Sequence, residues 1–129
     1  MPRKPSKILT DKELEIMRIV WEAGEASVKQ IQERLPGTRH YNSILTIIRV
    51  LEQKEHLTHR AEGRTFIYRA KRSREKSRRH ILNHLVKYVF GGSATSLVLN
   101  LVETGDLSDE DLVEIRKEIT LQRRAKEKS

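Results

Sequence analysis

One polar helix face, between residues 40 and 54, has the side chains best suited to chemistry. Asn42, Thr46 and Arg49 recur there at helical spacing. The opposite face is a stripe of apolar residues that a helix must bury: Ile44, Ile47, Ile48 and Leu51. Asn pairs bidentately with adenine, Arg with guanine, and a Thr methyl contacts thymine. The segment is a candidate recognition helix, although an ordinary amphipathic surface helix has the same pattern.

Two further helix signals precede this segment. Thr10 with Glu13, and Ser27 with Gln30, each fit a capping box, which predicts helices over residues 11–22 and 28–35. Pro36-Gly37 then breaks the chain before a third helix over residues 40–54. A short helix, a tight connection and a longer helix with a polar face describe a helix-turn-helix.

A β-hairpin follows the third helix, because two strand-like runs, residues 57–61 and 64–69, flank Glu62-Gly63. A hairpin in this position is the wing of a winged helix. We place Arg60 and Arg64 at its tip, against phosphates or in a minor groove. The predicted DNA contacts are Tyr41, Asn42, Ser43, Leu45, Thr46, Arg49, Arg60 and Arg64. The predicted core consists of Leu14, Met17, Ile31, Ile44, Ile48, Leu51 and Phe66.

The remaining sequence predicts three helices, over residues 73–90, from Ser93 towards Gly105, and from Asp109 to Leu121. They carry more apolar surface than three short helices can bury among themselves, so we expect an identical subunit to cover it across a two-fold axis. The predicted dimerisation residues are Leu82, Leu85, Val86, Val89, Leu97, Val98, Leu101, Leu112, Ile115 and Ile119. The alternative is a compact monomer in which the first of these helices packs on the winged helix.

These elements predict a mainly α protein with a small β-hairpin wing, an α+β fold. Residues 8–72 form the winged helix-turn-helix domain and residues 73–122 the helical dimerisation domain. Residues 1–7 and 123–129 are expected to be flexible tails, because both are rich in charge.

The net charge of +8 is concentrated in one segment. Residues 57–80 contain nine lysines and arginines against two acids, whereas the flanking segments are close to neutral. A concentrated positive patch favours a polyanionic partner and salt-dependent binding. A solvated basic surface is the plain alternative.

Several classes of protein do not fit this sequence. The chain has no cysteine, and no apolar run is long enough to cross a membrane, which predicts a cytoplasmic protein without disulfides or membrane insertion. No nucleophile elbow, phosphate-binding loop or dinucleotide fingerprint is found, so we expect neither an enzyme nor a cofactor. His80 and His84 have a spacing that can hold zinc, but solvated histidines are the simpler interpretation, and we predict no metal site.

Several segments, taken together, resemble the penicillinase repressor family, the BlaI/MecI group of winged-helix regulators. The matching segments are Leu9–Met17 with Trp21, Tyr41–Leu51, Phe66-Ile67-Tyr68, and Gly91-Gly92-Ser93 followed by Ser96–Asn100. The resemblance covers about residues 8–121, in the order of the family. The family favours Gly after the Lys at the end of the third helix, where this chain has Glu55.

The resemblance implies a dimeric repressor that binds an operator through its winged helices and pairs through its C-terminal helices. It also implies release from DNA when a membrane sensor detects β-lactam and a linked protease cuts the repressor after an Asn. The corresponding bond here is Asn100–Leu101, and the family members that are cut have Phe in place of Leu101. The other function that fits the sequence is a basic winged-helix adaptor for proteins, without sequence-specific DNA binding.

Overall fold

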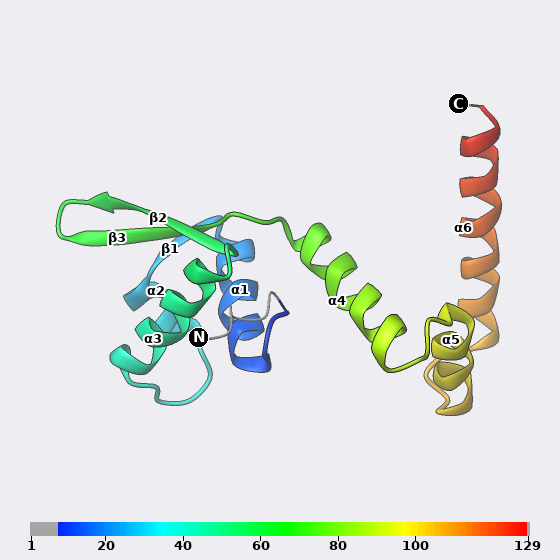
Figure 1. Cartoon of the computed structure of the whole chain (residues 1–129), viewed down its shortest axis with the longest axis horizontal. Coiled ribbons are helices and arrows are strands. Elements are labelled where there is room, and N and C mark those ends of the chain that lie inside the picture. Colours follow the sequence, from blue (N-terminus) through cyan, green and yellow to red (C-terminus); the bar gives the residue numbers. More distant parts are fainter. Residues whose placement is uncertain (1–7, 129) are drawn as a thin grey trace, which may run out of the picture. The chain divides into compact units, whose positions relative to one another are not determined.

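The computed structural model describes residues 8–128, which form six helices and one three-stranded sheet (Figure 1). The chain divides into two compact units, one up to Asn83 and one from His84 onwards. The elements are α1 (Asp11–Ala23), β1 (Glu25–Ser27), α2 (Val28–Arg34), α3 (Tyr41–Gln53), β2 (Leu57–Glu62), β3 (Thr65–Ala70), α4 (Arg74–Tyr88), α5 (Ala94–Glu103) and α6 (Asp109–Glu127).

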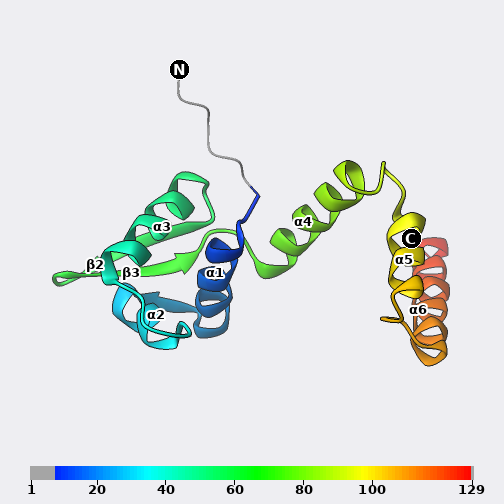
Figure 2. The same ribbon diagram turned by 90° about the horizontal axis from the view of Figure 1, so that it is seen from below.

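The first unit is a winged helix, as the sequence predicts. Strand β3 lies between β1 and β2 and is antiparallel to both. The hairpin of β2 and β3 extends beyond the three helices of this unit (Figures 1 and 2). Both predicted capping boxes are present, at Thr10 with Glu13 and at Ser27 with Gln30. The sequence allowed one or two strand residues before α2, and β1 has three, which add a third strand to the hairpin.

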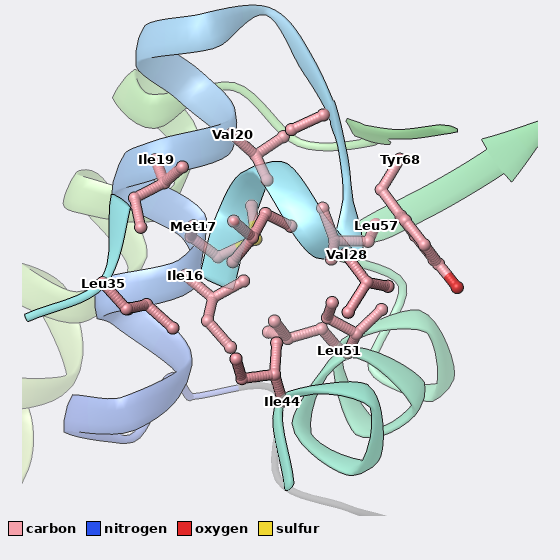
Figure 3. Close-up of a cluster of buried hydrophobic side chains, with 13 residues drawn as sticks. Ile16, Met17, Ile19, Val20, Val28, Leu35, Ile44, Leu51, Leu57 and Tyr68 are labelled. Atoms are coloured by element: carbon pink, nitrogen blue, oxygen red, sulfur yellow. The ribbon is translucent and has the colours of Figure 1, made fainter. Parts of the chain in front are cut away.

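The core of this unit lies where α1, α2 and α3 meet the sheet, and their apolar side chains point towards one another (Figure 3). It consists of Ile16, Met17, Ile19, Val20, Ala26, Val28, Ile31, Leu35, Ile44, Ile48, Leu51, Leu57 and Tyr68. Two predicted core residues are wrong. Leu14 is only partly buried, because α1 turns its Ile16–Ile19–Val20 side inwards. Phe66 is 49% exposed, because it lies towards the hairpin turn, and Tyr68 is the aromatic residue of β3 that is buried.

A buried ion pair joins the beginning of α1 to the end of α3. The ammonium of Lys54 lies 2.6 and 2.7 Å from the two carboxylate oxygens of Glu13 and donates to the carbonyl of Ile8 at 3.1 Å. Both side chains are about 5% exposed. Burial raises the pKa of the Glu13 carboxyl, but hydrogen bonds from Lys54 and Thr10 outweigh it and hold that pKa below its ordinary value.

The residue after Lys54 adopts an unusual backbone conformation. Glu55 has a φ of 67°, in the left-handed region that favours glycine. A side chain in this region costs roughly 1–2 kcal/mol. The preference of the resembled family for Gly at this position therefore has a physical reason, and this chain tolerates the strain at the same turn.

The first unit continues past residue 72, where we expected the domain boundary. The indole N–H of Trp21 donates to the carbonyl of Arg72 at 3.1 Å, and the guanidinium of Arg74 lies 5.9 Å from the centroid of the Trp21 ring. Ser77, in the first half of α4, is buried. These contacts fix the start of α4 against the winged helix.

The second unit contains the end of α4 together with α5 and α6. We expected the chain to fray after Leu121, but α6 continues to Glu127. A capping box at Ser108 begins this helix, and acids in its first turn and bases in its last turn complement its dipole. The predicted tail over residues 1–7 lies outside the described residues. None of the helices within residues 8–128 is both long and apolar enough to cross a bilayer.

The Glu13–Lys54 pair makes a prediction about stability. Lys54→Met leaves the Glu13 carboxylate buried without its partner, which should lower the free energy of unfolding by about 3–5 kcal/mol. Urea denaturation at neutral pH measures this change. The exposed residue Lys12 provides the matched control, because Lys12→Met removes a charge that is already in water.

Acid gives a second measurement on the same variant. In the wild-type protein the pKa of Glu13 is lower folded than unfolded, so the pair stabilises the fold above about pH 4.5 and this stabilisation is lost as the pH falls through the lower, folded pKa. In Lys54→Met the hydrogen bonds from Thr10 still lower that pKa, but burial, the largest cause, is no longer opposed by Lys54. The pKa of Glu13 should therefore rise relative to wild type, so acidification should reduce the deficit. A deficit that grows on acidification would contradict the assignment.

Candidate nucleic-acid interface

Helix α3 presents the predicted recognition face to solvent. Its inner side is anchored by three fully buried residues, Ile44, Ile48 and Leu51. The predicted contacts of this helix lie on the outer side: Tyr41, Asn42, Ser43, Thr46 and Arg49 are exposed and Leu45 is partly exposed. The amphipathic pattern thus orients the helix, because only one rotation about its axis buries the apolar stripe.

The hydroxyl of Thr46 is already engaged within the helix. It donates to the carbonyl of Asn42 at 2.9 Å. The side chain therefore has an acceptor oxygen and a methyl group left for a ligand. Asn42 and Arg49 are the other hydrogen-bonding side chains of this face, and both are exposed.

A groove of about 620 Å³ separates the recognition face from the wing. Helix α3 lies beside β2 (Figure 2). The residues lining it are Ser27, Val28, Lys29, Tyr41, Leu45, Arg49, Glu52, His59, Arg64, Thr65, Phe66 and Tyr68. The structure thus brings the predicted contacts Tyr41, Leu45 and Arg49 together with Arg64 of the hairpin turn. Three cations against one carboxylate make the groove suitable for an anion.

Arg60 does not share this groove. Its guanidinium forms two hydrogen bonds with the Glu25 carboxylate, at 2.6 and 3.1 Å, and one with Glu62 at 3.1 Å. The hydrogen bonds with Glu25 raise the pKa of Arg60, and those same bonds lower the pKa of Glu25. Neighbouring strand residues point to opposite faces, so Arg60 lies on the face away from His59. The predicted phosphate contact of the wing is therefore occupied by two carboxylates.

The groove contains a polar pair, Glu52 and His59, that we did not predict from the sequence. The Nδ1 atom of His59 lies 2.7 Å from the carboxylate of Glu52, and its ring lies 4.4 Å from that of Phe66 and 5.3 Å from that of Tyr68, between centroids. Burial, followed by the charge of Glu52, raises the pKa of Tyr68. His59 pairs with Tyr68 across the hairpin, and Phe66 lies two residues before Tyr68, so the three side chains share one face of the hairpin. With the hairpin register in hand, this arrangement could have been predicted from the sequence.

Ser43 lies away from the wing. It lines a separate pocket of about 390 Å³ between the beginning of α1 and the loop before α3, together with Thr38, Arg39 and His40. Asn42 and Thr46 line neither pocket and are exposed on α3. The eight predicted contacts therefore lie in four places. Asn42 and Thr46 are on the exposed face of α3, and Tyr41, Leu45, Arg49 and Arg64 line the groove beside the wing. Ser43 lines its own pocket, and Arg60 is paired with carboxylates.

The two histidines of α4 show no metal-like arrangement in the part of the chain described. Within residues 8–128, no group of three or more His, Cys, Asp or Glu side chains is placed to hold an ion. The ring of His84 lies 4.6 Å from that of Tyr88, one turn further along the helix.

Comparison with known proteins identifies the family. A family model described as "Penicillinase repressor" matches residues 9–121. The chain belongs to the penicillinase repressor family. This confirms the resemblance found in the sequence, and a repressor family means that the protein is a DNA-binding regulator and not an enzyme.

Two curated relatives show how far the similarity extends. The "Penicillinase repressor" of Bacillus licheniformis is 28% identical over 110 residues, which cover 83% of this chain and 85% of the relative. The "Methicillin resistance regulatory protein MecI" of Mammaliicoccus sciuri is also 28% identical over 110 residues, covering 84% of this chain and 89% of the relative.

Two solved structures are similar to part of this chain. The solution structure of the DNA binding domain of the repressor BlaI is 28% identical, with a TM-score of 0.49, and covers 57% of this chain and 90% of that one. The Bacillus licheniformis BlaI monomeric form in complex with the blaP half-operator is 27% identical, with a TM-score of 0.47, and covers 58% of this chain and 92% of that one.

The contrast between the two wing arginines is testable in this repressor. Arg64→Ala should reduce the slope of log affinity against log salt by about 1, because one phosphate contact is lost. Arg60→Ala should leave that slope unchanged, because the charge of Arg60 is balanced by Glu25 and Glu62. Gel-shift titrations of duplex DNA over a salt series measure both slopes. Equal changes in the two variants would show that Arg60 leaves its carboxylates to bind DNA.

Proposed function

We propose that this protein is a homodimeric, sequence-specific repressor that binds a pseudo-palindromic operator through two winged helices in the cytoplasm. The observation that carries the proposal is the exposed polar face of α3 beside a basic groove, on a helix anchored by the buried residues Ile44, Ile48 and Leu51. Membership in the repressor family supports it. Four side chains of the predicted set provide the chemistry: Asn42, Thr46, Arg49 and Arg64.

The recognition face offers a matched set of contacts for base edges in a major groove. Asn42 provides a donor and an acceptor, as adenine requires, and Arg49 provides two donors, as guanine requires. Thr46 adds a methyl group for thymine. Tyr41, Leu45 and Ser43 border this set, and Arg64 in the hairpin turn would hold the phosphates of the flanking backbone.

The second unit supports pairing with another copy of the chain. Neither α5 nor α6 has a buried residue. Many large apolar side chains on these helices and near the end of α4 are between 37% and 66% exposed. A helical unit of this size cannot be stable while its apolar surface stays in water. The proposed interface consists of Leu82, Leu85, Val86, Val89, Leu97, Val98, Leu101, Leu112, Ile115 and Ile119, across a two-fold axis.

Pairing would determine how the operator is bound. Two copies of α3 on one face of a duplex read two inverted half-sites, one helical turn or a multiple apart. Linking the half-sites is worth about 10²–10⁴ in affinity without any new contact. A change that separates the subunits therefore releases the DNA, and no further conformational change is required.

Cleavage between Asn100 and Leu101 is the proposed route to release, carried out by a protease linked to a sensor of β-lactams. The bond lies inside α5, where the carbonyl of Asn100 accepts a hydrogen bond from the N–H of Thr104 at 3.0 Å. Asn100 is exposed and α5 buries none of its residues, so local unfolding of this helix breaks little packing within the chain. Relatives named for penicillinase and methicillin resistance support β-lactam-responsive genes as the targets.

Selection from a random library of duplexes tests the proposal directly. The full-length protein should enrich duplexes with two inverted copies of one half-site, whose centres lie about 10 base pairs or a multiple apart. Asn42→Ala should then lower affinity for the selected duplex by about tenfold, and change affinity for an unrelated duplex far less. Asn83→Ala, an exposed Asn outside α3, is the control. Failure to enrich any sequence would favour the adaptor function instead.

Truncation tests the role of the second unit. A chain that ends at Asn100 should sediment as a monomer and bind the selected duplex about 10²–10⁴-fold more weakly, because the second half-site is lost. A chain that ends at Leu121 keeps every proposed interface residue and should still pair. If the chain ending at Asn100 remains a dimer with full affinity, release does not work through loss of pairing.

A further inference from the structure

Phe66 is an aromatic residue exposed at a position where the strand pattern calls for burial. It shares a face of the hairpin with Tyr68, which is 2% exposed, and with His59. Phe66 itself is 49% exposed. Burying a Phe side chain stabilises a protein by about 1.5–3 kcal/mol, so the fold leaves part of this gain unused.

The surroundings of Phe66 indicate what can cover it. It lines the groove between α3 and the wing, which also contains the cations Lys29, Arg49 and Arg64. A ligand for this groove needs negative charge beside an apolar surface. The sugar–phosphate backbone of a duplex has both, because each phosphate is flanked by the C–H face of a deoxyribose.

The Glu52–His59 pair fixes the ring of Phe66. The imidazole lies against Phe66 with 4.4 Å between ring centroids, and its Nδ1 atom is held by the Glu52 carboxylate at 2.7 Å. An aromatic ring held in this way loses little side-chain entropy when it makes a contact. The carboxylate of Glu52 is also engaged by His59, which reduces its repulsion of a nearby phosphate.

We propose that Phe66 is an additional DNA contact of this repressor, packing its ring on a deoxyribose of the backbone that Arg64 and Arg49 hold. The proposal rests on the proposed function, because it places the same duplex in the same groove. The contact adds affinity without a charge. It therefore differs in kind from the arginine contacts, whose strength falls as salt rises.

The test uses full-length protein and a duplex enriched by the wild-type chain. Phe66→Ala should weaken binding about tenfold, because DNA would no longer bury the roughly half of the Phe66 side chain that is exposed in the free protein. The slope of log affinity against log salt should stay at its wild-type value, because no charge is lost. Hydroxyl-radical footprinting reports protection of individual sugars, and the variant should lose protection at sugars flanking each half-site.

The variant Phe66→Leu tests whether Phe66 contacts the DNA itself or only positions the neighbouring His59. Leucine keeps an apolar side chain but removes the ring that stacks on His59, so it should stay within about threefold of wild type if contact with the sugar matters. The proposal is overturned if Phe66→Ala binds as tightly as wild type, if Phe66→Leu falls as far as Phe66→Ala, or if sugar protection is unchanged. Failure of the wild-type chain to enrich any duplex overturns the proposed function and this contact with it.

Discussion

The buried ion pair between Glu13 and Lys54 is the constraint on which the arrangement of the winged helix depends. Taking two charges out of water is costly, and only close geometry with further hydrogen bonds compensates for it. Here the backbone N–H of Thr10 donates to the Glu13 carboxylate, and the carbonyl of Ile8 accepts from the Lys54 ammonium. The pair fixes the end of α3 relative to the beginning of α1, which an apolar contact would do less strictly. Helix α3 is thereby held in one position, a requirement for any helix that reads base edges.

Charged residues elsewhere in the winged helix divide into two roles. Arg60 with Glu25 ties β2 to the short strand β1, and His59 with Glu52 ties β2 to α3. These pairs hold the wing between its neighbours. Arg49 and Arg64 line the groove. In the proposed complex, positioning and binding are therefore carried out by different basic residues, and the count of basic residues alone overstates the number of phosphate contacts.

The two units differ in how they bury their apolar side chains. The winged helix has a core of its own, whereas α5 and α6 bury none of their residues within the chain. In the proposed dimer, a second subunit provides the missing burial, and the stability of α5 depends on pairing. A cut at Asn100 would then remove the surface that holds the dimer together, which couples proteolysis to release of DNA through a single set of apolar contacts.

The sequence by itself determined the elements of this protein. Capping at Thr10 and Ser27, the apolar stripe from Ile44 to Leu51 and the hairpin around Gly63 follow from local periodicity and local hydrogen bonds, which neighbouring residues decide. Only the tertiary structure decided the partners of the charges and the depth of each side chain. Phe66 and Tyr68 have the same local pattern, yet one is exposed and the other buried, because burial depends on how far the helices extend along the hairpin. Glu25, which pairs with Arg60, and Glu13, which pairs with Lys54, lie 35 and 41 residues earlier in the chain, and a local sequence pattern does not reveal contacts at such a separation.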